Sequence, residues 1–149
     1  MKQALPLLAL LTLAGTGRAD EAKPAAPAAP ETKGEDLHAL MKSIGKQFGP
    51  LAKSVGDASK IEANRKLAQD LAALTDKCAA LIPAKAKAVP EAEREKFVAA
   101  YKAEIGKLAA DFRKIDEALA KKDFAAAKAA VADAGALKKE DHPKFIKKR

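Results

Sequence analysis

The chain has 149 residues, of which 48% are hydrophobic, and a formal net charge of +8, so it can bury the core of one ordinary domain. Aromatic residues make up only 4% of it, which argues against a β-sandwich or barrel, and the dominance of Lys, Ala, Leu and Glu favours helices. One cysteine and two histidines exclude a disulfide framework within the chain and give little support to sites that need several thiolates or imidazoles.

Residues 1–19 have the pattern of a secretory signal peptide. Lys2 supplies a positive start, residues 4–14 form an apolar run rich in Leu, and the small residues before Asp20 fit a cleavage site. The run is shorter than the about 20 apolar residues that a membrane-spanning helix needs. We therefore expect export to the periplasm or the medium, without stable insertion into a membrane.

Residues 20–34 alternate Ala and Pro and contain no large apolar residue, so we expect a disordered tether ahead of a folded domain at residues 35–149. Without residues 1–19, the chain has 26 basic and 20 acidic residues, a net charge of +6. This excess can steer an acidic partner towards the protein. Export argues against a nucleic acid as that partner.

Four segments with apolar residues at helical spacing follow the tether. The first covers residues 35–55 and contains Pro50, which predicts a kink just before it. The second begins near Asp57 or Ser59, either of which is a fair N-cap, and ends at Pro83.

The third segment begins at Pro90, a residue suited to the first helical position, and has the longest apolar stripe in the chain. The fourth runs from Asp123 to Phe145, and only residues 120–122 separate it from the third. So short a link makes the two segments an antiparallel pair. Four such segments without a strand pattern predict an all-α, up-down-up-down four-helix bundle, with a three-helix arrangement as the main alternative.

Met41 and His142 meet at one end of such a bundle, because the first helix begins where the fourth ends. At 1.5 Å per residue, each lies roughly 10 Å from that end, on facing surfaces. A thioether and an imidazole in this arrangement can bind one iron from opposite sides, which is His/Met haem ligation. By residue type alone, Met41 would be ordinary core packing and His142 a cap at a helix end.

The sequence around both residues resembles that of known haem proteins. Residues 36–41, Asp-Leu-His-Ala-Leu-Met, are similar to the opening helix of the cytochrome b562 family, and residues 41–51 resemble the first helix of cytochromes c′. Residues 142–145, His-Pro-Lys-Phe, are similar to the His-x-Lys-Tyr ending of cytochrome b562 and to the His-x-x-Phe ending of cytochromes c′. The resemblance implies that Met41 is the distal haem ligand and His142 the proximal one.

Lys138 and Asp141 occupy the positions of the two cysteines of cytochromes c′, so the resemblance implies a non-covalent haem b. Cys78 lies on the apolar stripe of the second helix, where we expect a small buried hydrophobe. Pro143 disfavours helical geometry at His142 and is the main obstacle to ligation there.

An apolar wall is expected beside the two ligands. Its expected members are Leu40, Ile44, Leu74, Leu81, Phe97 and Phe145. Lys138, one turn before His142, is placed to meet a haem propionate. His38 is a less favoured alternative ligand, because it lies about 60° from Met41 around the helix.

These features predict a secreted, periplasmic b-type cytochrome that carries single electrons and is not an enzyme. Its partner would be an unidentified redox protein, for which an acidic surface would suit the net charge. A homodimer through the first two helices, like that of cytochromes c′, stays open. The rival hypothesis is a haem-free helical bundle that serves as an envelope interaction or chaperone-like module.

Overall fold

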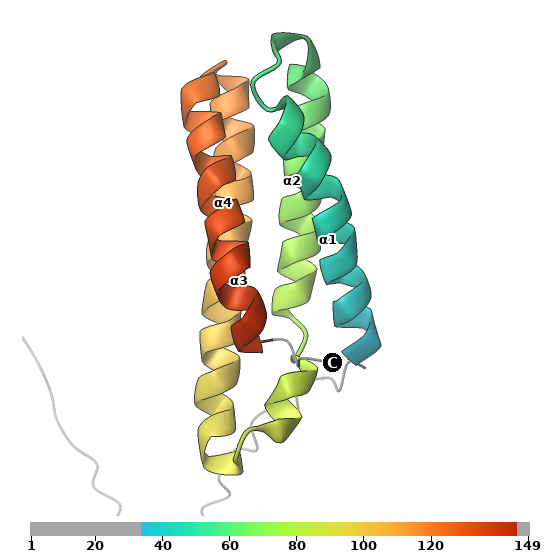
Figure 1. Ribbon diagram of the computed structural model, residues 1–149, viewed down its shortest axis with the longest axis vertical. Helices are drawn as coiled ribbons and strands as arrows, with labels where there is room; N and C mark the ends of the chain where they lie inside the picture. Colours follow the sequence, from blue (N-terminus) through green and yellow to red (C-terminus); the bar gives the residue numbers. More distant parts are fainter. Residues whose placement is uncertain (1–33, 146–149) are drawn as a thin grey trace, which may run out of the picture.

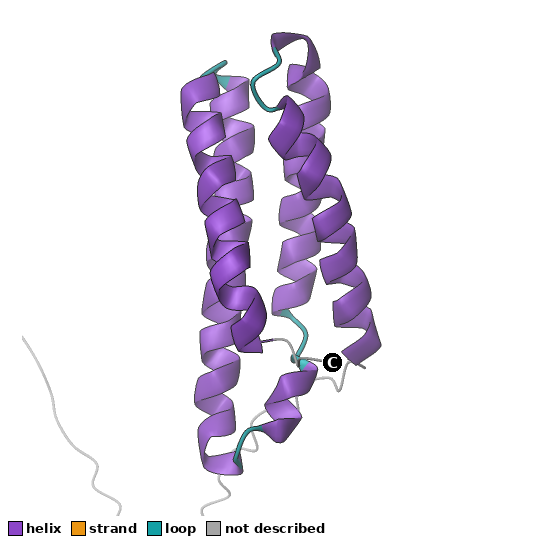
Figure 2. Cartoon of the chain, viewed as in Figure 1, coloured by secondary structure: helices purple, strands orange, loops and turns teal. Residues whose placement is uncertain are grey.

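Four antiparallel helices form an up-down-up-down bundle in the computed structural model, which describes residues 34–145 (Figure 1). The helices are α1 (Gly34–Ser54), α2 (Ile61–Ala79), α3 (Glu91–Ala120) and α4 (Phe124–Phe145), with short 3₁₀ helices η1 (Ala58–Lys60) and η2 (Ala84–Ala88) in the first two connections. The described residues contain no strand (Figure 2). The predicted all-α four-helix bundle is therefore confirmed, and the three-helix alternative is wrong. The predicted signal peptide and the tether up to residue 33 lie outside the described residues.

The apolar stripes of the helices meet in one core, to which the helices contribute unequally. The largest fully buried apolar side chains are Leu51 in α1, Leu71 in α2, and Tyr101, Phe112, Ile115 and Leu119 in α3. Among the residues of α4 whose burial the structure describes, the buried ones are all alanines, Ala127, Ala130 and Ala134. Full burial of a Leu, Ile or Phe stabilises a fold by about 1.5–3 kcal/mol, which an alanine cannot match. The core therefore rests mainly on α1, α2 and α3, and α4 is held less strongly.

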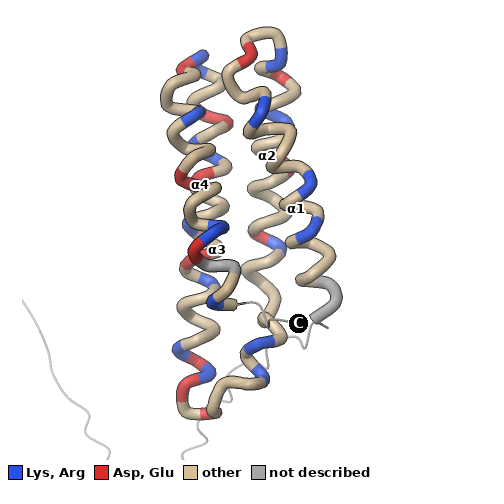
Figure 3. The backbone as a smooth tube through the Cα atoms, viewed as in Figure 1, with Lys and Arg blue, Asp and Glu red and all other residues tan. Residues whose placement is uncertain are grey.

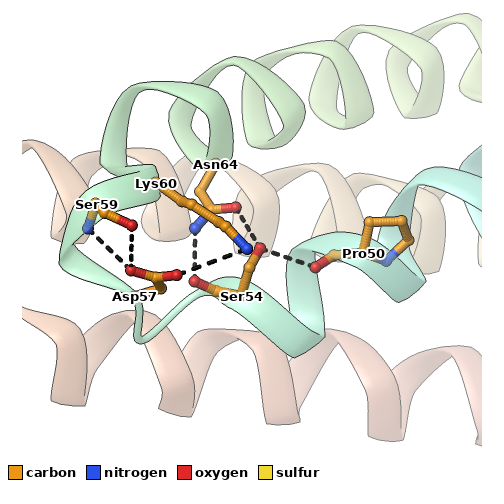
Figure 4. A network of polar contacts seen from close by, with 6 residues as sticks. All are labelled: Pro50, Ser54, Asp57, Ser59, Lys60 and Asn64. Carbon is orange, nitrogen blue, oxygen red and sulfur yellow. Dashed lines mark hydrogen bonds and ion pairs between the residues drawn. The ribbon is translucent and has the colours of Figure 1, made fainter.

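A polar network fixes the turn between α1 and α2 (Figure 4). The buried side chain of Asn64 donates to the Ser54 carbonyl at 2.7 Å, and the Ser54 hydroxyl lies 2.6 Å from Oδ1 of Asn64 and 2.9 Å from the Pro50 carbonyl oxygen. Asp57 accepts from the Ser59 hydroxyl at 2.6 Å and from the Ser59 N–H at 2.9 Å, and these bonds lower the pKa of Asp57. Of the two predicted caps, Asp57 is the one the structure uses, and it caps η1 ahead of α2.

Two prolines lie inside helices. α1 continues through Pro50 to Ser54, where the kink stays a prediction, and α4 continues through Pro143 to Phe145. The expectation that Pro143 removes His142 from helical geometry is therefore wrong. Each proline takes one N–H donor from its helix. Both are exposed and close to the end of the helix, so each disturbs only the final turns.

The turn between α3 and α4 is as short as the sequence predicts. Lys122 adopts a left-handed φ of 57°, which reverses the chain, and the Asp123 carboxylate accepts from the Ala126 N–H at 2.9 Å. Asp123 therefore caps α4 at its first turn. This tight turn holds α4 beside α3.

Neighbouring helices do not all pack equally closely. The backbones of α1 and α2, of α2 and α3, and of α3 and α4 run close together, whereas α1 and α4 meet mainly through side chains. In Figure 1 these two helices lie on the nearer side of the bundle with their ribbons apart. The α1/α4 seam is thus the least tightly packed of the four sides of the bundle.

Candidate functional site

A narrow crevice of about 50 Å³ lies behind the α1/α4 seam. Its wall consists of Met41, Ile44 and Phe48 from α1, Leu108 and Phe112 from α3, and Ala134 and Lys138 from α4. The wall is apolar except for the thioether of Met41 and the ammonium group of Lys138. A single soft donor inside an apolar wall, with one cation beside it, suits a flat apolar ligand that carries a metal and acidic groups.

Two glycines mark the register of α1 against α4. A Cβ atom added at Gly135 in α4 would lie 3.8 Å from Cζ of Phe48 in α1, and one added at Gly45 in α1 would lie 3.6 Å from Nζ of Lys138 in α4. Each glycine therefore lies opposite a large side chain of the other helix. A Cβ atom at either position would be in ordinary van der Waals contact with that side chain.

This register brings Met41 and His142 to the same level. Along α1, the step from Phe48 to Gly45 and on to Met41 goes back by three and then four residues. Along α4, the step from Gly135 to Lys138 and on to His142 goes forward by three and then four. Because the helices are antiparallel, equal steps in opposite directions keep the positions opposite one another. The structure describes the helical backbone of His142 but not its side chain.

Three of the predicted site residues lie together in the crevice, namely Met41, Ile44 and Lys138. Ile44 is buried, Met41 is half-buried, and Lys138 is exposed. His38, the alternative ligand, is also exposed and is not in the crevice wall.

The other predicted wall residues do not line the crevice. Leu40 is half-buried and packs against the core outside the crevice. Phe145, near the end of α4, has its ring centre 5.4 Å from that of Phe97 and 5.4 Å from that of Tyr101, both in α3. Phe97 and Phe145 therefore fasten the end of α4 to α3.

A second contact holds the same end of α4. Nζ of Lys85, in η2, donates to the carbonyl oxygen of Lys144 at 2.5 Å and lies 3.3 Å from that of Pro143. The last carbonyl groups of a helix have no partner within the helix, and a lysine side chain satisfies them well. Lys85 and the Phe145 ring thus hold the turn that carries His142. Nothing in the sequence around Lys85 indicates this contact, because it depends on the path of η2.

Four further residues of the crevice wall were not predicted as site residues: Phe48, Leu108, Phe112 and Ala134. Phe48 follows Met41 by seven residues, which is two turns, so both lie on one face of α1. The helical spacing predicts all four as core residues. Their place beside the crevice depends on the separation of α1 and α4, which no local pattern reveals.

Cys78 lies in α2 behind Tyr101, whose hydroxyl donates to the Cys78 carbonyl at 2.9 Å. Burial raises the pKa of the Cys78 thiol to about 11 and also raises the pKa of Tyr101. A thiol that stays protonated and buried is a poor nucleophile and a poor metal ligand. The predicted role of Cys78 as a buried hydrophobe agrees with this environment.

Within residues 34–145, no three His, Cys, Asp or Glu side chains gather as they would to hold a metal ion. No helix in the same region is both long and apolar enough to pass through a bilayer.

Comparison with known proteins gives one match. The family model described as cytochrome b562 matches residues 36–146, which covers all four helices. No curated protein and no solved structure gives a significant match. The matched region spans most of the chain and includes Met41, Lys138 and His142. The chain therefore belongs to the cytochrome b562 family, a family of four-helix-bundle cytochromes.

Proposed function

We propose that the chain binds one haem b without a covalent bond, in the α1/α4 seam, and carries single electrons in the periplasm. The observation that supports this most strongly is the register of the seam, in which the positions of Met41 and His142 lie opposite one another. A bound haem supplies an iron that exchanges one electron at a time. The chain's contribution is to hold it, to set its potential and to exclude water from it.

In this proposal Met41 and His142 would hold the haem iron, through a thioether and an imidazole. Thioether ligation by Met41 raises the reduction potential, and the more basic imidazole of His142 gives the stronger bond. If both residues held the iron, the protein would leave no open site for a substrate, which would suit electron transfer better than catalysis. Ile44, Leu108 and Phe112 provide an apolar wall, and Lys138 neutralises a propionate.

Binding requires the seam to open. The crevice holds about 50 Å³, whereas pockets for ligands of this size measure roughly 300–1,000 Å³. Phe48 and Lys138 are the side chains that span the seam, so they must move apart. Opening is feasible because the buried residues of α4, among those that the structure describes, are alanines, and the α4 backbone is not packed against α1.

Covalent attachment is not part of the proposal. Thioether bonds to haem need cysteines beside the proximal histidine, and the corresponding positions hold Lys138 and Asp141. Cys78, the one thiol, is fully buried in α2 and its pKa is raised to about 11. Periplasmic location is inferred from the signal-peptide pattern of residues 1–19.

Titration of the purified chain with haemin tests this function. We expect one haemin per chain, an optical spectrum of a six-coordinate low-spin haem in the reduced form, and complete extraction of the haem by acid butanone. Rising melting temperature with added haemin would accompany binding, since a ligand of the native state stabilises it. A colourless protein that stays colourless with haemin would instead favour the haem-free bundle.

A further inference from the structure

Charges are distributed unevenly over the bundle. Between Leu37 and Ser54, α1 carries three lysines, Lys42, Lys46 and Lys53, and no acidic residue (Figure 3). On α4, the described acidic side chains are Asp133 and Glu140, and both line a groove between α3 and α4, away from α1. Over the side chains that the structure describes, the outer edge of the α1/α4 seam is therefore basic.

The lysines of this edge have no acidic partner. Among the described residues, Lys42, Lys46 and Lys139 form no ion pair, and all three are exposed. Among the other described basic residues, six form an ion pair, while several exposed lysines, such as Lys77, Lys96 and Lys102, do not. Arg65 pairs with Asp116 at 2.8 Å and Arg113 pairs with Asp76 at 2.6 Å, each joining α2 to α3. Unpaired lysines side by side repel one another and do not stabilise the fold.

Their positions coincide with the crevice. Lys42 follows Met41 and Lys46 follows Gly45, so both lie on the shoulder of α1 next to α4. Lys139 follows Lys138 on the opposite shoulder. By helical position, the three lysines therefore lie on the solvent side of the seam, next in sequence to Met41, Gly45 and Lys138, at the crevice that the proposed function assigns to haem. We call Lys42, Lys46 and Lys139 the basic rim.

We propose that the basic rim is the docking surface for the acidic face of an electron-transfer protein. The electron transfer in this inference rests on the proposed function. The presence of the basic rim does not depend on it. Unpaired lysines attract carboxylates, and a charged patch raises association rates by about 10-fold to 1,000-fold at low salt. A partner bound at the rim would lie next to the crevice, so the electron would have the shortest distance to cross between the two proteins. Electron-transfer complexes bury small interfaces, so a few lysines are enough.

The first test measures electron exchange between the haem-loaded protein and a purified acidic flavodoxin by stopped flow. The test variant is Lys42→Gln/Lys46→Gln/Lys139→Gln. The matched control is Lys77→Gln/Lys96→Gln/Lys102→Gln, which changes the net charge equally at exposed lysines of α2 and α3.

We expect the rim variant to react about tenfold more slowly than the parent at low salt, and the control less than about twofold more slowly. The difference should vanish at an ionic strength of about 0.5 M, because screening then acts within a few ångströms. Equal slowing of both variants would overturn the proposal, since net charge alone would explain it.

The second test does not depend on haem. Binding of poly-L-glutamate is measured by calorimetry with both triple variants, and binding of phosphatidylglycerol vesicles and of a DNA duplex is measured in parallel. Loss of poly-L-glutamate binding in the rim variant alone supports the surface, even if the chain proves to bind no haem. A rim that binds vesicles or DNA but not poly-L-glutamate would overturn the proposal.

Discussion

The ammonium group of Lys138 lies 5.9 Å from the centre of the Phe48 ring, so a cation–π contact joins α4 to α1 across the seam. Phe48 also packs edge-on against Phe112 of α3, with ring centres 5.9 Å apart. Phe48 therefore fills space that a ligand in the crevice would need. Its ring must move before the crevice can widen.

Replacement of Phe48 by alanine should speed the uptake of haemin severalfold, because it removes the side chain that closes the crevice. The protein should lose up to about 3 kcal/mol of stability, since the ring is half-buried. Phe124→Ala is the control, because Phe124 is half-buried at the opposite end of α4. Stopped-flow absorbance at the Soret band measures both rates. Equal rates in the two variants would show that Phe48 does not control entry.

Lys85→Met should weaken haem binding and lower the melting temperature. The replacement keeps a long, unbranched apolar side chain but removes the donor to the carbonyls of Pro143 and Lys144, at a cost of roughly 1 kcal/mol. The loosened turn carries His142, so the spectrum of the reduced haem should also shift. Lys87→Met, at an exposed position of the same 3₁₀ helix, is the control and should leave both quantities unchanged.

Stability should fall as the pH rises above about 9. Burial raises the pKa of Cys78 from 9.0 to about 11 and raises that of Tyr101, so the folded state keeps protons that the unfolded state releases. Proton release then favours unfolding. Tyr101→Phe should make the decline of melting temperature between pH 10 and 11 less steep.

The same variant should cost only about 0.5 kcal/mol at neutral pH, because the Cys78 carbonyl keeps its hydrogen bond from the Leu81 N–H at 3.0 Å. Thermal unfolding followed by circular dichroism at each pH provides the data. An unchanged alkaline slope in Tyr101→Phe would contradict the assignment of raised pKa to this hydroxyl.

Export should leave a mature chain that begins within a few residues of Asp20. Mass spectrometry of the protein from the envelope fraction measures its N-terminus. Retention of residues 1–19 would contradict the predicted signal peptide.

Removal of residues 20–33 should change the melting temperature by no more than a few degrees, because the segment contains no large apolar residue to bury.

The helices could be predicted well from sequence because their signals are local. The apolar stripe of α3 predicts the course of that helix, and the cap at Asp123 predicts where α4 begins. The short link between α3 and α4 predicts that the two helices are antiparallel. The expected effect of Pro143 on the backbone of His142 was wrong. A residue before a proline prefers an extended conformation, but the contacts that stabilise the surrounding helix outweigh this preference. The contacts of Phe145 and Lys85 hold that last turn in place.

The candidate site could be predicted only in part. Met41 and Ile44 lie on the apolar face of the first helix, and Lys138 lies one turn before His142. Sequence patterns therefore predict all three. Phe48 is on the same face as Met41, yet its role depends on Gly135, which lies opposite it across the seam. Phe97 and Phe145 were predicted in the apolar wall beside the ligands, but neither lines the crevice; the Phe145 ring packs between those of Phe97 and Tyr101.

The central claim is that Met41 and His142 hold one iron between them, and haemin affinity in two variants tests it most directly. His142→Ala should lose most of the haem, because it removes the stronger ligand. Met41→Ala should keep a five-coordinate haem with a lower reduction potential, because the thioether raises the potential. Gel-filtered samples titrated with haemin, with potentials measured by spectroelectrochemistry, give both results. Equal haemin affinity in the parent and in His142→Ala would contradict the ligand assignment.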